Sequence, residues 1–181
     1  RIVFDLNDGS RLVYADSRTL GTIYAIKQDE IWRIKGLNEL GPEPLSEEFT
    51  LEYLKKNLSS KKGSIKTFLL DQSIIAGLGN IYVDEALFLS GIHPVRSPES
   101  VTHEEAEKLF ESINKVISDG INDGGTTFRD YRDGNGEKGS HQDNLFVYGR
   151  DGKACRKCGG KIEKTRVGGR GTHYCPNCQE I

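Results

Sequence analysis

The sequence predicts an α+β protein that ends in a metal-stabilised ribbon, and three observations support this fold class. Apolar and polar side chains alternate over residues 1–26, which is typical of antiparallel strands. Between residues 46 and 121, apolar side chains recur every three or four positions, which is typical of amphipathic helices. All four cysteines lie near the end of the chain, in two Cys-x-x-Cys pairs.

The alternating segment predicts an antiparallel sheet. Strands are expected over residues 1–6, 11–14 and 22–26, with a tight turn at Asn7–Ser10. A sheet of this size is too small to be stable alone. The chain also contains no methionine, so we expect it to be part of a longer protein whose upstream strands complete this sheet.

The middle of the sequence predicts a helical domain. Four helices are expected, over residues 46–58, 65–75, 81–89 and 103–121. Ser46 is the expected N-cap of the first helix, and Thr102-His-Glu-Glu105 is a capping box for the last, which should stop at Gly124-Gly125. Residues 126–144 are polar and predict a long loop, and residues 145–148 predict a strand that leads into the ribbon.

The two cysteine pairs predict one structural zinc site. Cys155 and Cys158 are separated by sixteen residues from Cys175 and Cys178, a spacing that places four thiolates around one tetrahedral Zn²⁺. Four sulfur ligands leave no open coordination position, so the metal is expected to hold the fold and not to perform chemistry. Between the pairs, the sequence predicts two short strands joined by a glycine turn at Gly168–Gly171. Two disulfides or four free cysteines are the alternatives.

Charge is distributed unevenly along the chain. The whole sequence has a net charge of −2, whereas residues 150–181 contain eight Lys/Arg and three Asp/Glu, a net of +5. A basic module on an acidic body favours a local contact with an anionic partner, and a basic ribbon that is merely solvated is the alternative. No apolar run approaches the length of a membrane span, and cysteines held by metal suit a reducing compartment. We therefore expect no membrane partner and a cytoplasmic location.

Two glycine-rich segments have the composition of phosphate-binding sites. Gly77-Leu-Gly79-Asn80 opens a predicted helix, where free backbone N–H groups bind anions, and Lys61 and Lys66 lie just upstream. Arg170 is flanked by glycines at the expected hairpin tip, where a guanidinium can bind two phosphate oxygens. An ordinary helix N-terminus and a solvated turn arginine are the alternatives.

Six blocks of sequence, in order and over essentially the whole chain, resemble the formamidopyrimidine-DNA glycosylase family. They are Leu70-Asp-Gln72, Ala76-Gly-Leu-Gly-Asn-Ile-Tyr-Val-Asp-Glu85, Gly91-Ile-His-Pro94, Gly124-Gly-Thr-Thr-Phe-Arg-Asp-Tyr131, Val147-Tyr-Gly-Arg150 and Gly169-Arg-Gly-Thr-His-Tyr-Cys-Pro176. The resemblance implies a bacterial base-excision repair DNA glycosylase and AP lyase. Such an enzyme removes oxidised purines, namely 8-oxoguanine and formamidopyrimidines, from duplex DNA by flipping the damaged base out of the helix.

The resemblance also implies a domain organisation. Residues 1–36 would be the last part of an N-terminal β-sandwich, and residues 37–44 a linker. Residues 45–144 would form a helix-two-turn-helix DNA-binding domain whose lesion-recognition loop covers about residues 126–140. Residues 145–181 would form the zinc ribbon. The implied partner is double-stranded DNA with oxidised bases or abasic sites, bound by a monomer in the bacterial cytoplasm at the nucleoid.

Site residues follow from the same resemblance, position by position. Four residues would bind phosphates around the lesion: Lys61, Lys66, Asn80 and Arg170. Arg18 would fill the gap left by the extruded base. The lesion loop would contain Thr126, Thr127, Phe128, Arg129 and Tyr131. Arg170 would also be catalytic, in the second elimination step.

Two departures from the family pattern limit what is expected of this chain. The family's amino-terminal proline nucleophile, the glutamate after it and a catalytic lysine match no residues here. Leu20 stands where the family usually has a phenylalanine. The chain is therefore expected to carry the DNA-binding half of the enzyme, and a catalytically silent module that binds damaged DNA is the alternative. A sibling glycosylase for oxidised pyrimidines is disfavoured, because the block over residues 126–131 resembles the loop for purines.

Overall fold

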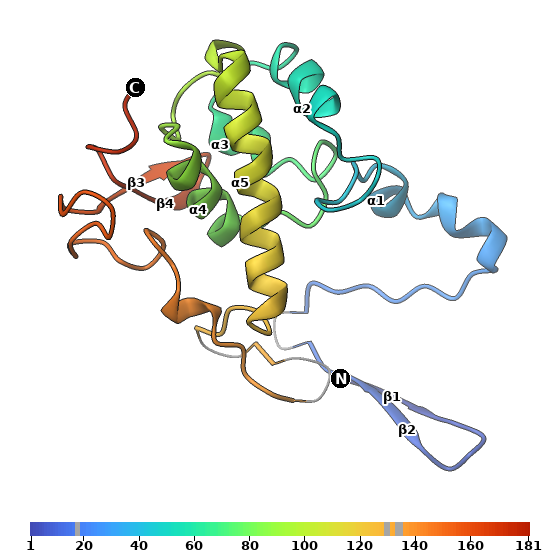
Figure 1. Ribbon diagram of the computed structural model, residues 1–181. Coiled ribbons are helices and arrows are strands. Elements are labelled where there is room, and N and C mark those ends of the chain that lie inside the picture. Colours follow the sequence, from blue (N-terminus) through green and yellow to red (C-terminus); the bar gives the residue numbers. More distant parts are fainter. Residues whose placement is uncertain (17–18, 129–130, 133–135) are drawn as a thin grey trace. The chain divides into compact units, whose positions relative to one another are not determined.

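The computed structural model describes residues 1–16, 19–128, 131–132 and 136–181. The chain divides into two compact units, residues 1–38 and residues 39–181, which are considered separately (Figure 1). The described residues contain helices together with strands that pair antiparallel, which confirms the α+β class. No helix in the described part of the chain is long and apolar enough to cross a membrane.

The first unit contains a β-hairpin and two short helical segments. Strands β1 (Ile2–Asp5) and β2 (Arg11–Tyr14) pair antiparallel, followed by η1 (Gln28–Arg33) and α1 (Lys35–Asn38). The predicted third strand over residues 22–26 is wrong. A strand needs a hydrogen-bonded neighbour, and β1 and β2 pair only with each other within the described residues.

The second unit is built around a long central helix, α5 (His103–Asn122). Figure 1 shows α4 (Asn80–Ser90) alongside α5, and α2 (Leu51–Leu58) also packs on α5. The short helix α3 (Ile65–Leu69) packs on α4. Fully buried aliphatic side chains from all four helices form one core; they include Leu54, Ile65, Leu69, Val83, Leu87, Leu109 and Ile113.

The capping box predicted for the last helix is confirmed. The Thr102 hydroxyl accepts a hydrogen bond from the backbone N–H of Glu105 at 3.3 Å, and the Glu105 carboxylate accepts one from the N–H of Thr102 at 2.8 Å. These two bonds satisfy donors that a helix start leaves free. Gly124 and Gly125 follow the helix with positive φ angles of 69° and 88°, as expected for a glycine stop.

The starts and ends of the earlier helices differ from prediction. Helix α2 is capped by Thr50, whose hydroxyl accepts from the N–H of Tyr53, and not by Ser46. Helix α3 ends at Leu69 instead of residue 75, because the Asp71 carboxylate accepts bonds from both the N–H and the hydroxyl of Ser73. This local side-chain turn competes with continuation of the helix.

The zinc-ribbon region packs on the outer side of α4. Strands β3 (Glu163–Val167) and β4 (Arg170–Tyr174) pair antiparallel, and β4 contacts α4 (Figure 1). A short 3₁₀ segment, η2 (Pro98–Ser100), lies between α4 and α5, and another, η3 (His141–Asp143), lies between α5 and the ribbon. A small second core contains Phe88, Val147, Cys155, Ile162 and Cys175.

The strand predicted over residues 145–148 is absent, since this segment forms bends and turns. Its backbone N–H groups are taken by a side chain instead of a neighbouring strand. The Glu85 carboxylate accepts hydrogen bonds from Phe146, Val147 and Tyr148 at 2.7 to 2.9 Å. An apolar tetrapeptide therefore has the composition of a strand without forming one, because its hydrogen-bond partner lies 61 to 63 positions earlier in the chain.

Candidate nucleic-acid interface

The four cysteines form a metal site. Their sulfur atoms all lie within 4.8 Å of one another. The Cys158–Cys175 and Cys155–Cys178 sulfur distances are 3.5 and 3.9 Å, too long for disulfides, which need about 2.05 Å. Zn–S bonds of about 2.3 Å in a tetrahedron separate the sulfurs by about 3.8 Å, so the cluster fits Zn²⁺. Two backbone N–H groups, of Lys157 and Gly160, also point at cysteine sulfurs at 3.4 Å.

The hairpin places Arg170 next to its tip. Gly168 and Gly169 form the turn with φ angles of 55° and 76°, and Val167 pairs with Arg170 across it. Positive φ at both turn positions is the geometry of a tight hairpin, which glycine adopts without strain. Arg170 is exposed, and its guanidinium has no hydrogen-bond or ion-pair partner in the described part of the chain. A free arginine in this position can bind an anion.

The N-terminus of α4 lies against the same hairpin. The Asn80 side-chain amide donates to the carbonyl oxygen of Gly171 at 3.0 Å, so Asn80 touches the residue that follows Arg170. Gly79 is the N-cap and supplies no side-chain acceptor, which leaves the first backbone N–H groups of α4 available to an anion. Gln72 fixes the preceding turn by accepting from the N–H of Gly77 at 2.9 Å and donating to the carbonyl of Leu78 at 3.2 Å.

Lys66 does not have the position predicted for a phosphate ligand. Its side chain is fully buried, and its Nζ lies 2.6 Å from the Asp84 carboxylate and donates to the carbonyl of Gly171 at 3.0 Å. Burial lowers the pKa of the Lys66 amine, and the Asp84 carboxylate opposes that shift. Since all of its partners are inside the protein, the expectation of a direct phosphate contact from Lys66 is corrected.

Lys61 has the exposure that Lys66 lacks. It lies in the turn between α2 and α3, where its side chain is 48% exposed and its Nζ is 3.9 Å from the Asp71 carboxylate. A pair at this distance and exposure is worth little. The Lys61 ammonium can therefore leave Asp71 for a stronger anion.

The predicted lesion loop is closed at its neck. The Thr127 N–H donates to Gln142 at 2.8 Å, and the Thr127 hydroxyl accepts from the N–H of Gly139 at 3.0 Å. Thr126 reaches the hydroxyl of Tyr82 on α4 at 3.3 Å. The neck thus ties the two ends of the loop to each other and one end to α4.

Of the other residues predicted for the site, the structure describes Phe128 and Tyr131 but not Arg18 and Arg129. The Phe128 ring lies 5.6 Å from that of Tyr148 and is half exposed, as is Tyr131. Arg18 and Arg129 lie outside the described residues. Leu20 belongs to the first unit and is 75% exposed.

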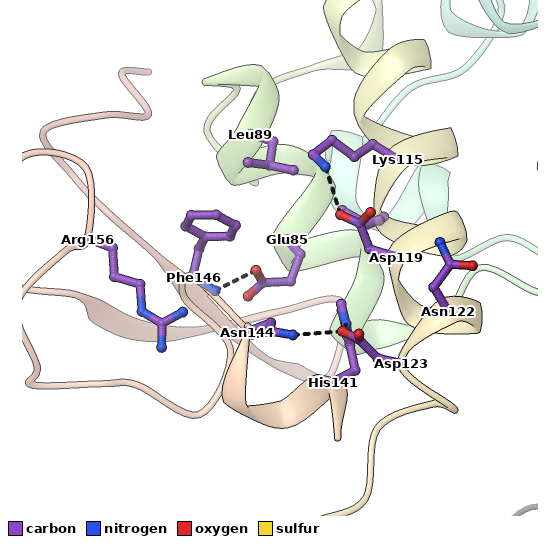
Figure 2. A pocket seen from close by; sticks show the side chains of 11 residues that line it. Glu85, Leu89, Lys115, Asp119, Asn122, Asp123, His141, Asn144, Phe146 and Arg156 are labelled. Carbon is purple, nitrogen blue, oxygen red and sulfur yellow. Dashed lines mark hydrogen bonds and ion pairs between the residues drawn. The ribbon is translucent and has the colours of Figure 1, made fainter. Parts of the chain in front are cut away.

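A cavity of about 550 Å³ lies between α4, α5 and the segment before the ribbon, and Figure 2 shows its lining. Acidic and basic side chains both line it, including Glu85, Asp119, Lys115 and Arg156. Most of them are committed to each other or to the backbone: Lys115 pairs with Asp119 at 2.9 Å, and Arg156 donates to the carbonyl of Asp143. The cavity contains none of the residues that form the Arg170–Asn80 surface.

Sequence reasoning missed the buried acids that join α4 to the ribbon. Asp84 and Glu85 are both at most 2% exposed, in a stretch whose neighbours Val83 and Ala86 are core residues. Acids within an apolar helical run are the signal that could have identified them, because buried carboxylates need partners. Here the partners are backbone N–H groups of the ribbon region and, for Asp84, also the Lys66 amine.

Comparison with known proteins identifies the family. Residues 40–132 match the formamidopyrimidine-DNA glycosylase H2TH domain, and residues 152–181 match a zinc finger found in FPG and IleRS. The formamidopyrimidine-DNA glycosylase of Pelotomaculum thermopropionicum is 47% identical over 99% of this chain and 65% of its own length. That of Geobacillus kaustophilus is 48% identical over 98% of this chain and 65% of its own length.

Solved structures agree with these sequence matches. The MutM (FPG) protein of Thermus thermophilus superimposes with a TM-score of 0.89 at 40% identity, covering 95% of this chain and 65% of that one. A Lactococcus lactis FPG mutant in complex with Fapy-dG-containing DNA gives a TM-score of 0.89 at 37% identity, covering 99% and 65%. The present chain spans about 65% of the length of these relatives. Its four clustered cysteines form the structural zinc site of the matched zinc finger. The chain belongs to the formamidopyrimidine-DNA glycosylase family.

Proposed function

We propose that this chain is the DNA-binding part of a base-excision repair glycosylase and AP lyase that removes oxidised purines from duplex DNA by base flipping. One observation supports this most strongly. Arg170, with a free guanidinium within the described residues, and Asn80, at the start of α4, lie beside one another through the Gly171 carbonyl. A guanidinium and a helix N-terminus on one surface form a two-point clamp for a sugar–phosphate backbone.

The clamp suits a base-flipping enzyme for an energetic reason. Extruding a base costs a few kcal/mol of stacking and pairing. Phosphate contacts on either side of the lesion fix the backbone in the bent form from which the base has left, and so offset part of that cost. We assign phosphate contacts to Arg170, Asn80 and Lys61, and a further role to Arg170 in the second elimination step.

The other predicted residues and domains have roles in the same proposal. Arg18 would occupy the space of the extruded base. The loop residues Thr126, Thr127, Phe128, Arg129 and Tyr131 would close on the flipped base. The domains would be residues 1–36, a linker over 37–44, residues 45–144 for DNA binding and residues 145–181 for the ribbon. The protein would act as a monomer in the cytoplasm, at the bacterial nucleoid.

Salt-dependent DNA binding tests the DNA-binding role. Duplexes with an abasic-site analogue or an 8-oxoguanine should bind better than undamaged duplex. Arg170→Ala should weaken binding about 10-fold or more and lower the slope of log Kd against log salt by about 1, because one phosphate contact is lost. Arg156→Ala is the matched control, since it removes an arginine from the same ribbon at the cavity of Figure 2. Equal slopes for Arg170→Ala and the unchanged chain would contradict the clamp.

Catalysis is tested separately, in a protein of the relatives' full length that contains this chain. Borohydride should trap it covalently on 8-oxoguanine DNA, because the proposed lyase reaction passes through an imine. Specific binding of damaged DNA without any trapped product would leave a catalytically silent damaged-DNA-binding module as the function.

A further inference from the structure

Lys66 and Asp84 form a completely buried ion pair beneath the hairpin of the ribbon. Both side chains are 0% exposed, and the Lys66 Nζ is 2.6 Å from the Asp84 carboxylate. A buried pair of this kind is weak evidence for stability, because removing two charges from water costs several kcal/mol per ion. Its other contacts therefore indicate what it does.

Each charge has one further strong contact, and both contacts are with the backbone of β4. The Lys66 amine donates to the carbonyl of Gly171 at 3.0 Å, and the Asp84 carboxylate accepts from the N–H of His173 at 2.8 Å. These two backbone groups belong to the residues on either side of Thr172, and the first of them, Gly171, directly follows Arg170 in the sequence. The amide of Asn80 donates to the same Gly171 carbonyl at 3.0 Å.

The hairpin needs such an anchor because the metal holds its other end. Cys175 follows β4 immediately, whereas the turn at Gly168–Gly169 is at the opposite end of the two strands. A two-stranded ribbon is only marginally stable by itself. Zinc alone would leave the turn and Arg170 free to swing. At the turn end of the hairpin, Gly168 packs on Thr67 of α3, and a Cβ added to Gly168 would overlap the methyl group of Thr67.

We propose that the Lys66–Asp84 pair is a positioning device that holds Arg170 in a fixed place beside the N-terminus of α4, so that both bind the same stretch of DNA backbone. This inference rests on the proposed function. Lys66 and Asp84 touch no DNA themselves; they act through the Gly171 carbonyl and the His173 N–H. This positioning role explains why Lys66 is buried, although the sequence suggested that it would contact phosphate directly.

The proposal is tested by Asp84→Asn in the zinc-loaded chain. Removing the charge frees Lys66 from its partner and weakens the hold on β4. DNA affinity should fall about 10-fold, and the salt slope should fall by about 1, as for Arg170→Ala. The double variant Asp84→Asn/Arg170→Ala should bind no worse than Arg170→Ala alone, because both changes remove one contact. A purely structural role would instead give additive losses.

Glu85→Gln is the matched control. It neutralises the neighbouring buried carboxylate of α4, which holds the backbone of residues 146–148 and not the hairpin. It should leave the salt slope unchanged. Zinc content, measured for every variant, reports whether the ribbon is folded.

A second variant guards against misfolding. Lys66→Met/Asp84→Leu removes both charges together, a change that is often tolerated at buried pairs. It should retain zinc and show the same reduced slope. If the variants keep the full salt slope while Arg170→Ala lowers it, the positioning role is wrong and the proposed function stands. If Arg170→Ala itself has no effect, the proposed function fails.

Discussion

Arg96, in the loop between α4 and η2, should contribute more to the stability of this chain than the exposed Lys115–Asp119 ion pair of α5. Its guanidinium binds the Glu105 carboxylate with both terminal nitrogens, at 2.5 and 3.0 Å. Glu105 is also the capping residue that accepts from the N–H of Thr102, at the start of α5. Because α4 and α2 both pack on α5, loosening its first turn affects the helices that carry the candidate site.

The size of the effect follows from the pKa of Glu105. Hydrogen bonds from Arg96, which are the largest cause, together with those from Thr102 lower this pKa from 4.5 to about 2. That shift corresponds to roughly 3 kcal/mol at neutral pH. About a quarter of the Glu105 side chain is exposed, so solvent screening reduces the expected figure to about 2 kcal/mol. Arg96→Ala should therefore lower the melting temperature by roughly 4–8 °C.

The pH dependence has a defined sign. A carboxyl whose pKa is depressed by folding stabilises the protein above its unfolded value, and the contribution disappears as pH falls through the folded value. The stabilisation should be complete above about pH 5 and lost toward pH 2. Thermal unfolding at pH 7 and at low pH measures this, with Lys115→Ala as control for an exposed pair. Arg96→Ala costing no more than Lys115→Ala, or showing the same pH profile as the unchanged chain, would refute the reasoning.

Two further predictions concern the ribbon and the loop neck. Chelation of zinc should unfold the ribbon and abolish DNA binding, while the circular dichroism signal of α2 to α5 remains; retained affinity after verified metal loss would contradict the role of the ribbon. Gly139→Ala should destabilise the neck of the loop, because its Cβ would overlap the carbonyl oxygen of Gly125, whereas Gly36→Ala has open space. Faster proteolysis within residues 126–140 measures the change at Gly139, and equal rates for both variants would count against it.

Local patterns predicted those parts of the fold whose partners are near in sequence. The capping box at Thr102 and the glycine turn of the hairpin depend on contacts within a few residues. The capping box is confirmed, whereas the turn contains only Gly168 and Gly169 of the predicted Gly168–Gly171, because Arg170 and Gly171 pair as the start of β4. The cysteine spacing likewise fixes the metal site, since each pair supplies two ligands from one turn. The Ser46 cap is wrong because Thr50, four residues later, offers the same chemistry.

Long-range contacts account for what sequence reasoning could not predict. The sequence does not distinguish an exposed lysine from a buried one. Only the fold shows that Lys66 binds Asp84, which is eighteen positions away. The tetrapeptide at residues 145–148 has the composition of a strand, but its backbone is bound by Glu85. In both cases the deciding partner is an acidic residue of α4, and the helical periodicity of apolar residues does not predict what that acid contacts.

The two adjacent acids of α4 bind two separate segments of the ribbon region. Asp84 holds β4 through the N–H of His173, and Glu85 holds the segment leading to the first cysteine pair through three N–H groups. Adjacent helical residues point about 100° apart, so one helix can grip two separate segments of the ribbon region. Since the proposed phosphate-binding end of α4 is the start of the same helix, ribbon and helix must move together. In the proposed function, a rigid unit of this kind would hold Arg170 and Asn80 in place before DNA binds, and the ordering cost of binding would fall accordingly.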